Sequence, residues 1–191
     1  SNQTYFLKMI NKIKELAEYF FDDIVSIRRH LHKYPELSFN EYETSTYIKS
    51  ILHSWKIPFT ENIADTGIVV LIEGKNPTLR TLALRADFDA LPIIEENKID
   101  YCSLNKGVMH ACGHDVHTAS LLGVIKILDT LRDDWEGSIK FVFQPAEEQY
   151  PGGAKAMINE GVLENPKVGK MFGQHVFPDL DAGKVGFCSG K

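Results

Sequence analysis

The chain of 191 residues is 43% hydrophobic and 25% charged, an ordinary globular composition with enough length for one sizeable domain. Its formal net charge of -5 provides no basic surface for nucleic acid, so we expect no nucleic-acid partner. No apolar run is long enough to cross a membrane and the sequence starts with no signal-peptide pattern, so we expect no membrane partner. Three cysteines are too few for a disulfide framework and favour a reducing, cytoplasmic location.

The N-terminal part of the chain predicts helices. We set residues 1–8 aside as a tag remnant or a disordered lead. From Ile13 to Leu31 apolar residues recur at spacings of three and four, which predicts one amphipathic helix that ends before Pro35. Residues 40–56 predict a second helix, with Asn40 as its cap and Glu43 as the reciprocal capping glutamate.

After Pro58 the pattern changes to alternating strands and helices. Short apolar runs rich in β-branched residues predict strands at 66–74, 78–87, 138–145 and 167–178. Helical spacing predicts helices at 115–132 and 152–164. This order predicts an α/β fold with a helix-covered, mostly parallel, mixed sheet.

Acids and imidazoles follow several of these strands. The candidates come from four segments: Asp87 and Asp89, Glu147 and Glu148, His175, and the stretch MHACGHDVHTA at residues 109–119. Ligands of open α/β sheets bind beyond the carboxyl ends of the strands. We therefore expect these side chains to meet at one edge of the sheet.

The stretch MHACGHDVHTA contains the strongest candidate pair, Cys112 and His114. A Cys-x-His turn can direct a thiolate and an imidazole at one metal ion of borderline softness. We interpret Asp115 as the N-cap of the following helix. His117 is read as a supporting or packing histidine rather than a ligand, and the role of His110 stays open in the same way.

The stretch QPAEE provides two adjacent glutamates at a strand end. Because neighbouring strand residues point in different directions, one of Glu147 and Glu148 can coordinate a metal while the other addresses its bound water. In RADFDALP, an aspartate can orient a ligand histidine or the base, although Asp89 is equally well explained as a turn residue. His175, considered alone, is more typical of a packed core histidine than of a ligand.

Five motifs occur in one order, and together they carry a family resemblance: RRHLHKYPELSFNE, RADFDALP, MHACGHDVHTA, QPAEE with GGAKAMI, and GQHVFP. From about residue 26 to its end, the chain resembles the di-metal amidohydrolases of the aminoacylase/carboxypeptidase exopeptidase family. The branch includes N-acyl amino acid amidohydrolases, hippurate hydrolases, N-acetyldiaminopimelate deacetylases and auxin-conjugate hydrolases. The resemblance implies an α/β/α zinc-exopeptidase-like catalytic domain.

The resemblance also implies roles and partners. It makes four residues metal ligands (Cys112, His114, Glu148 and His175), Glu147 the general base that acts through a metal-held water, and Asp87 a supporting aspartate. The cofactors would be two divalent ions, zinc or manganese foremost, with nickel or cobalt also compatible. The substrate would be a small N-acyl amino acid or a related acyl conjugate, and the full-length protein a homodimer or larger.

Relatives in this family are longer than the present chain. They carry a lid or dimerisation domain that begins about where GKVGFCSGK ends, followed by a segment with a final ligand histidine. We therefore expect residues 9–191 to be the N-terminal portion of the catalytic domain, and this fragment alone to be inactive or very feeble.

Two other functions remain open on the residues alone. Cys112 could be the nucleophile of a cysteine hydrolase, with a histidine as base and Asp115 as its orienting acid. Alternatively, Cys112, His114 and His175 could hold a structural zinc in a non-catalytic module. We interpret Cys102 and Cys188 as incidental thiols, and Arg28 with Arg29 as part of a solvated helix face.

Overall fold

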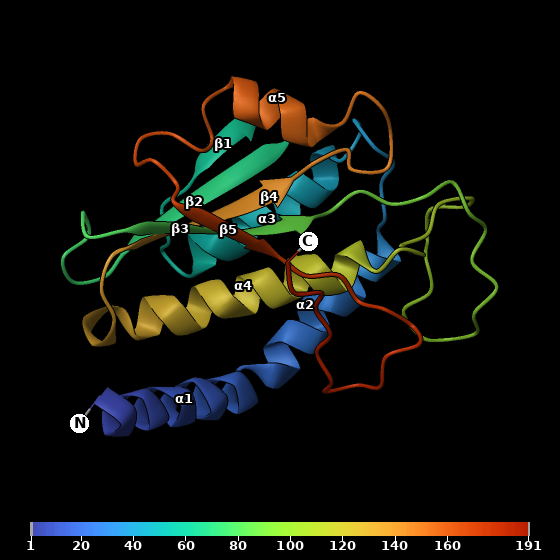
Figure 1. Cartoon of the computed structure of the whole chain (residues 1–191). Coiled ribbons are helices and arrows are strands. Elements are labelled where there is room, and N and C mark those ends of the chain that lie inside the picture. Colours follow the sequence, from blue (N-terminus) through green and yellow to red (C-terminus); the bar gives the residue numbers. More distant parts are fainter. Residues whose placement is uncertain (1, 191) are drawn as a thin grey trace.

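A computed structural model describes residues 2–190 (Figure 1). The elements in chain order are α1 (Asn2–Tyr19), α2 (Phe21–Lys33), α3 (Tyr42–Ser54), β1 (Thr60–Ile63), β2 (Gly67–Glu73), β3 (Thr81–Asp87), α4 (His114–Thr130), a 3-10 turn (Arg132–Asp134), β4 (Ser138–Gln144), α5 (Gly153–Asn159) and β5 (Lys170–Gly173). Within these residues, no helix combines the length and the apolar character needed to span a membrane.

The strands form one mixed sheet in the order β1-β2-β4-β3-β5. Strand β3 runs parallel to both β4 and β5, whereas β2 is antiparallel to β4 and β1 is antiparallel to β2. The mixed α/β sheet is therefore confirmed, although only half of its strand pairings are parallel. Strand β1 was not predicted, because its sequence TENI lacks an apolar pattern and lies mostly exposed at the sheet edge.

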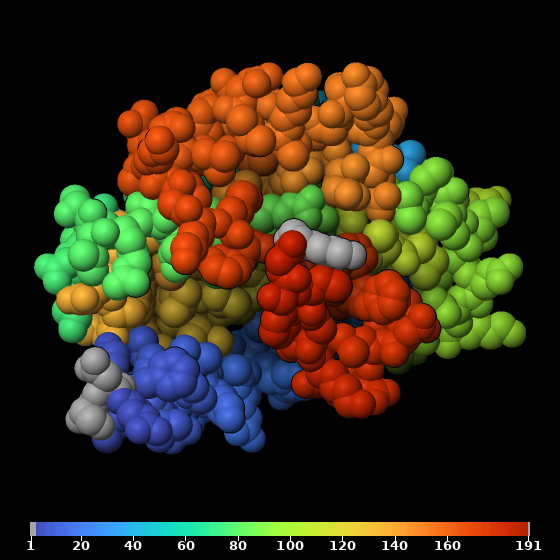
Figure 2. All heavy atoms as spheres, in the orientation of Figure 1, coloured from blue at the N-terminus to red at the C-terminus, as the bar shows by residue number. Residues whose placement is uncertain are grey.

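Helices cover both faces of the sheet (Figure 1), and with all atoms drawn the orange α5 region and the blue α1 lie on opposite sides of the molecule (Figure 2). On one face, Phe141 and Phe143 of β4 pack into a core shared with α2, α3 and α4. On the other face, Val142 packs against Met157 of α5 and the following Val162. The alternation of β4 side chains between these two clusters explains why its sequence is apolar at nearly every position.

The single helix expected between Ile13 and Leu31 is two helices, α1 and α2, which meet at Phe20. Helix-type backbone hydrogen bonds from Phe20 N to Leu16 O and from Ile24 N to Phe20 O continue across the junction. The spacing of the apolar residues therefore stays helical there, and the sequence does not reveal the break. Residues 2–8 lie in the first turns of α1. Their origin as a tag remnant remains untested.

The cap expected for α3 is also different. Asn40 donates to Ser38 O instead of capping the helix, and the helix starts at Tyr42 without a side-chain bond from the preceding residue. The carboxylate of Glu36 performs the capping role, because it accepts hydrogen bonds from the backbone N–H groups of Glu43 (3.2 Å) and Thr44 (2.5 Å). The capping rule places the cap at the residue next to the helix, whereas Glu36 lies before the turn that leads into α3.

Candidate metal centre

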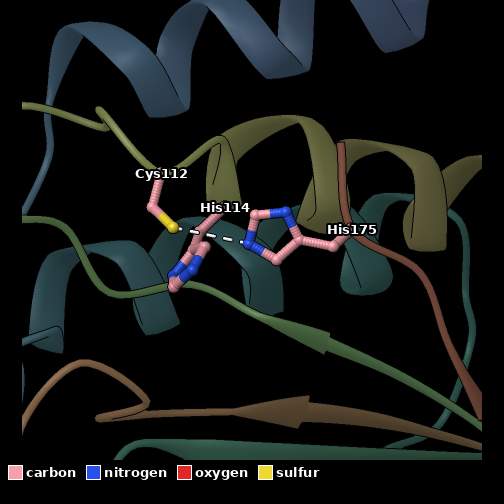
Figure 3. Close-up of side chains that lie close together, drawn as sticks. All are labelled: Cys112, His114 and His175. Atoms are coloured by element: carbon pink, nitrogen blue, oxygen red, sulfur yellow. Dashed lines mark hydrogen bonds between the residues drawn. The ribbon is translucent and has the colours of Figure 1, made fainter. Parts of the chain in front are cut away.

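The predicted site residues meet at the carboxyl ends of the parallel strands. Strand β3 leads to Asp87 and Asp89, β4 leads to the glutamate pair, and β5 leads to His175. The start of α4 adds Cys112 and His114 beside them (Figure 3). The expected convergence at one sheet edge is therefore what the structure shows.

Cys112, His114 and His175 form the first group of possible ligands. The Sγ atom of Cys112 lies 3.4 Å from Nε2 of His175. Each of the three residues offers a ligand atom, and these atoms lie within 4.8 Å of one another. Figure 3 shows the three side chains pointing toward one another from the start of α4 and from the segment after β5.

The two glutamates form a second group with the same histidine. Nε2 of His114 lies 3.5 Å from Oε1 of Glu148 and 3.9 Å from Oε2 of Glu147. Both His114 Nε2 and Glu148 Oε1 are buried, and within residues 2–190 neither atom has a hydrogen-bond partner. A buried polar atom without a partner costs about 1–3 kcal/mol. A divalent cation between these atoms would satisfy both, so the residues fit a metal site.

Asp89 orients the central histidine. Its Oδ1 lies 3.2 Å from Nδ1 of His114, and its Oδ2 accepts hydrogen bonds from Ser38 Oγ (2.7 Å) and from the backbone N–H of Glu148 (2.9 Å). Burial alone would raise the pKa of Asp89, but these hydrogen bonds outweigh burial and lower the pKa to about 2. Of the two interpretations left open for Asp89, its contacts favour the supporting role.

Asp87 supports a different histidine. Its Oδ1 lies 2.7 Å from Nδ1 of His117, and its Oδ2 pairs with Arg85 (2.7 Å) and lies 3.6 Å from His114 Nε2. The other ring nitrogen of His117 accepts the backbone N–H of Val176 at 3.0 Å. Both ring nitrogens of His117 are therefore engaged, which agrees with its interpretation as a supporting residue. His117 also lies close enough to Asp87 and His114 to form a third group of possible metal ligands.

The interpretations of Asp115 and Arg28 were wrong. The residue before α4 is Gly113, and Asp115 lies buried within the first turn, where its Oδ1 accepts the backbone N–H of Val116 at 2.9 Å. Its Oδ2 is 2.7 Å from Nδ1 of His32 and 3.0 Å from Nε of Arg28. Arg28 is therefore an ion-pair partner rather than part of a solvated face, while Arg29 lies over the Tyr101 ring. These pairs join α2 to α4 across more than 80 residues of sequence, which no local rule detects.

His32 is a buried residue that the sequence reasoning passed over. Its second nitrogen lies 2.9 Å from Oε1 of Glu95, so it links α2 to the long loop before α4 as well as to Asp115. These carboxylates, Asp115 first, raise the pKa of His32 against the opposing effect of burial. The only signal in the sequence is its place within the motif RRHLHKYPELSFNE, which by itself assigns no role to this histidine.

Three other candidates stay outside the site. His110 is buried, and burial lowers its pKa to about 4, so its ring is neutral at ordinary pH. Cys102 donates to the backbone carbonyl of Asn97, and Cys188 is exposed. Neither thiol belongs to a possible metal group among the described residues, which is consistent with incidental thiols.

The environment of Cys112 disfavours a nucleophilic thiolate. Burial, a hydrogen bond with Glu148 and the negative charges of the nearby carboxylates raise the pKa of the thiol to about 12. Catalytic cysteines need a lowered pKa, supplied by a cation or a helix N-terminus. A thiolate at Cys112 therefore requires a positive charge close by, which a bound cation would supply.

Gly113 sits between the Cys112 turn and the segment after β5. Its φ is +86°, and a Cβ atom at this position would lie 2.3 Å from Cγ2 of Val176. We expect Gly113→Ala to lower the free energy of unfolding by about 1–2 kcal/mol for the left-handed backbone and by about 1–3 kcal/mol more for the forced displacement of Val176. Urea denaturation measures this change.

Gly107→Ala is the matched control. Gly107 has a similar φ of +83°, but a Cβ there would meet nothing within 4 Å. The free energy of unfolding of Gly107→Ala should therefore fall only by the cost of the left-handed backbone. Equal losses of stability in the two variants would contradict the role of the Gly113–Val176 contact in joining the two halves of the site.

Comparison with known proteins agrees with this geometry. The chain is 45% identical over 179 residues to an N-acyl-L-amino acid amidohydrolase of Geobacillus stearothermophilus, covering 94% of the chain and 48% of that protein. It is 44% identical over 167 residues to an N-acetyl-L-cysteine deacetylase of Bacillus subtilis, covering 87% of the chain and 39% of that protein. The chain therefore spans less than half the length of these relatives.

Solved structures and family comparison give the same result. The crystal structure of the Bacillus subtilis YxeP protein, described as a dinuclear metal-binding peptidase of the M20 family, matches with a TM-score of 0.80 and 40% identity over 85% of this chain and 45% of that one. The sequence model of peptidase family M20/M25/M40 matches residues 83–190, more than half of the chain and all of the candidate metal centre. The chain belongs to the peptidase family M20/M25/M40.

Proposed function

We propose that this chain contributes the metal-binding part of an active site that hydrolyses the amide bond of N-acyl amino acids. The observation that carries the proposal is a pair of buried atoms, His114 Nε2 and Glu148 Oε1, which face each other at 3.5 Å and have no hydrogen-bond partner among residues 2–190. Cys112 and His175 lie beside them and complete a donor set of thiolate, imidazole and carboxylate. Such a mixed set suits divalent ions of borderline softness.

Each side chain has a role in this proposal. Cys112, His114, Glu148 and His175 would hold two divalent cations, with zinc or manganese foremost and nickel or cobalt also compatible. When bound, the cations would polarise the amide carbonyl and lower the pKa of a water molecule toward about 7. Asp89 and Asp87 keep the imidazoles of His114 and His117 oriented through their Nδ1 atoms.

Glu147 is the proposed general base. Its side chain is 41% exposed, the largest exposure within the glutamate pair, so it can reach a substrate that enters from solvent. It would take a proton from the attacking water and deliver it to the nitrogen of the leaving amine. The products would be a carboxylic acid and a free amino acid.

The names of the relatives support the substrate class. One is described as acting on N-acyl-L-amino acids and another on N-acetyl-L-cysteine, which share an amide next to a carboxylate-bearing carbon. The three free thiols of the chain support a reducing, cytoplasmic location. A homodimeric state of the full-length protein remains a prediction from the family.

Metal removal tests this function against the cysteine-hydrolase alternative. We expect the full-length protein, in its longest natural form, to lose hydrolysis of N-acetyl amino acids when a chelator removes the metal. Activity should return when zinc or manganese is added back. A cysteine nucleophile would keep its activity after elemental analysis has confirmed that the metal is gone. Persistent turnover in metal-free protein would therefore contradict the proposal, whereas alkylation of Cys112 would stop either mechanism and cannot separate them.

A further inference from the structure

Glu41 is a fully buried carboxylate that the proposed mechanism leaves without a role. It lies directly before α3, at the end of the motif RRHLHKYPELSFNE. A buried carboxylate is unfavourable unless its oxygens are hydrogen-bonded. Oε1 of Glu41 accepts the backbone N–H of Ala146 at 2.7 Å, and Oε2 accepts the hydroxyl of Thr66 at 3.2 Å. The first of these bonds reaches the residue immediately before Glu147.

Ala146 has a backbone conformation that needs support. Its φ is +48°, in the left-handed region that is unfavourable for a residue with a Cβ atom. Both of its backbone polar groups are held, because its N–H donates to Glu41 and its C=O accepts the N–H of Gly153 at 2.9 Å. Such conformations persist where the surrounding structure fixes them, and they gather at functional sites.

Glu147 depends on this backbone for its position. Among residues 2–190 its side chain has no hydrogen-bond partner, and its one ion-pair contact is with His114 Nε2 at 3.9 Å. The residues on either side are fixed instead. The N–H of Ala146 is bound by Glu41 and the N–H of Glu148 is bound by Asp89 at 2.9 Å. Two buried carboxylates therefore hold the backbone from which Glu147 projects.

We propose that Glu41 is a positioning residue that aims Glu147 at the scissile amide through the backbone N–H of Ala146. This inference rests on the proposed function, because it assigns Glu147 the role of general base. Asp89 also contacts His114, so its replacement would disturb a predicted metal ligand at the same time. The hydrogen bonds of Glu41 reach none of the four predicted ligands, which makes it the cleaner position to change.

The test compares three replacements in the longest natural form of the protein. Glu41→Met keeps the side-chain length but removes the acceptor, and we expect kcat to fall about 10- to 100-fold with KM and metal content nearly unchanged. Glu41→Gln keeps an amide oxygen that can accept the Ala146 N–H, so its kcat should stay within about 3-fold of the parent. Glu41→Asp keeps the charge but is one methylene too short, and it should lose kcat as Glu41→Met does.

Glu36→Met is the matched control for stability. Glu36 belongs to the same motif and caps α3 through the backbone N–H groups of Glu43 and Thr44. Its loss should lower the unfolding midpoint without changing kcat of the folded protein. A purely structural role of Glu41 would give both methionine variants the same pattern. If Glu41→Met does not fold, Glu41→Asp takes its place in the comparison of kcat and metal content.

The outcomes separate this inference from the proposed function. Loss of kcat in Glu41→Met, rescue by Gln and no loss in Glu36→Met support the positioning role. Unchanged kcat in Glu41→Met or Glu41→Asp, or loss of metal from either variant, overturns it. Glu147→Gln is measured in parallel. If that variant is inactive while Glu41→Met keeps full kcat, only the positioning role fails; if Glu147→Gln stays active, the proposed function fails with it.

Discussion

Replacing Glu147 with Gln is expected to lower kcat for an N-acetyl amino acid by about 10²- to 10⁴-fold, the range a positioned general base contributes. The amide keeps the size of the side chain but cannot accept the proton from the attacking water. Metal content should stay at the parent value, because Glu147 is the more exposed member of the pair and lies farther from His114 Nε2 than Glu148 does. Steady-state kinetics with elemental analysis of the same sample measures both quantities.

A control for the removed charge is available on the surface. Glu96 lies exposed in the loop between β3 and α4, so Glu96→Gln makes the same chemical change away from the site. Its kcat should match that of the parent. Loss of metal together with activity in Glu147→Gln would contradict the role of base and would indicate that Glu147 is a ligand.

Replacing Glu148 with Gln should have the opposite primary effect. Glu148 has a buried oxygen that faces His114 and has no hydrogen-bond partner in the described part of the chain, and a neutral amide would bind a cation there much more weakly than a carboxylate. We expect the affinity for zinc to fall more than about 100-fold, beyond the 10- to 100-fold typical of groups that only support a ligand. Competition with a chromophoric chelator measures the affinity, and activity should be lost in proportion to metal.

Added zinc gives a second readout of Glu148→Gln. Saturating metal should restore part of its activity, whereas Glu147→Gln should stay inactive at any metal concentration. A Glu148→Gln variant that retains its metal at parental affinity would show that the two glutamates have been assigned the wrong way round.

Much of the fold could be predicted because its strands are strongly patterned. The buried runs around Phe141 and Ile68 are rich in β-branched and aromatic residues and are bounded by glycine, proline or acids, so their position follows from local sequence. Strand β1 escaped prediction since pairing with β2, rather than burial, makes TENI a strand. The junction at Phe20 escaped because the backbone hydrogen bonds continue through it.

The site was predictable in its residue types but not in its supporting contacts. Cys112, His114 and the glutamate pair stand out because costly side chains cluster next to strand and helix ends. The contacts that support the site do not stand out in the sequence, because their partners are far apart in the chain. Glu41 and Ala146 are separated by 105 positions, and His32 and Asp115 by 83. Asp115 was misread as a cap for the same reason: its pairing with α2 depends on tertiary packing, which local rules do not include.

In the proposed centre, the thiol, the two imidazoles and the Glu148 carboxylate surround shared cations. Anomalous diffraction from zinc-loaded crystals of the longest natural form tests it most directly. We predict two peaks about 3.5–4 Å apart, with Cys112 Sγ about 2.3 Å from zinc and with His114, Glu148 and His175 within bonding distance. Zinc peaks that lie elsewhere, or a fully loaded protein with no peak in contact with His114 and Glu148, would contradict the proposed centre.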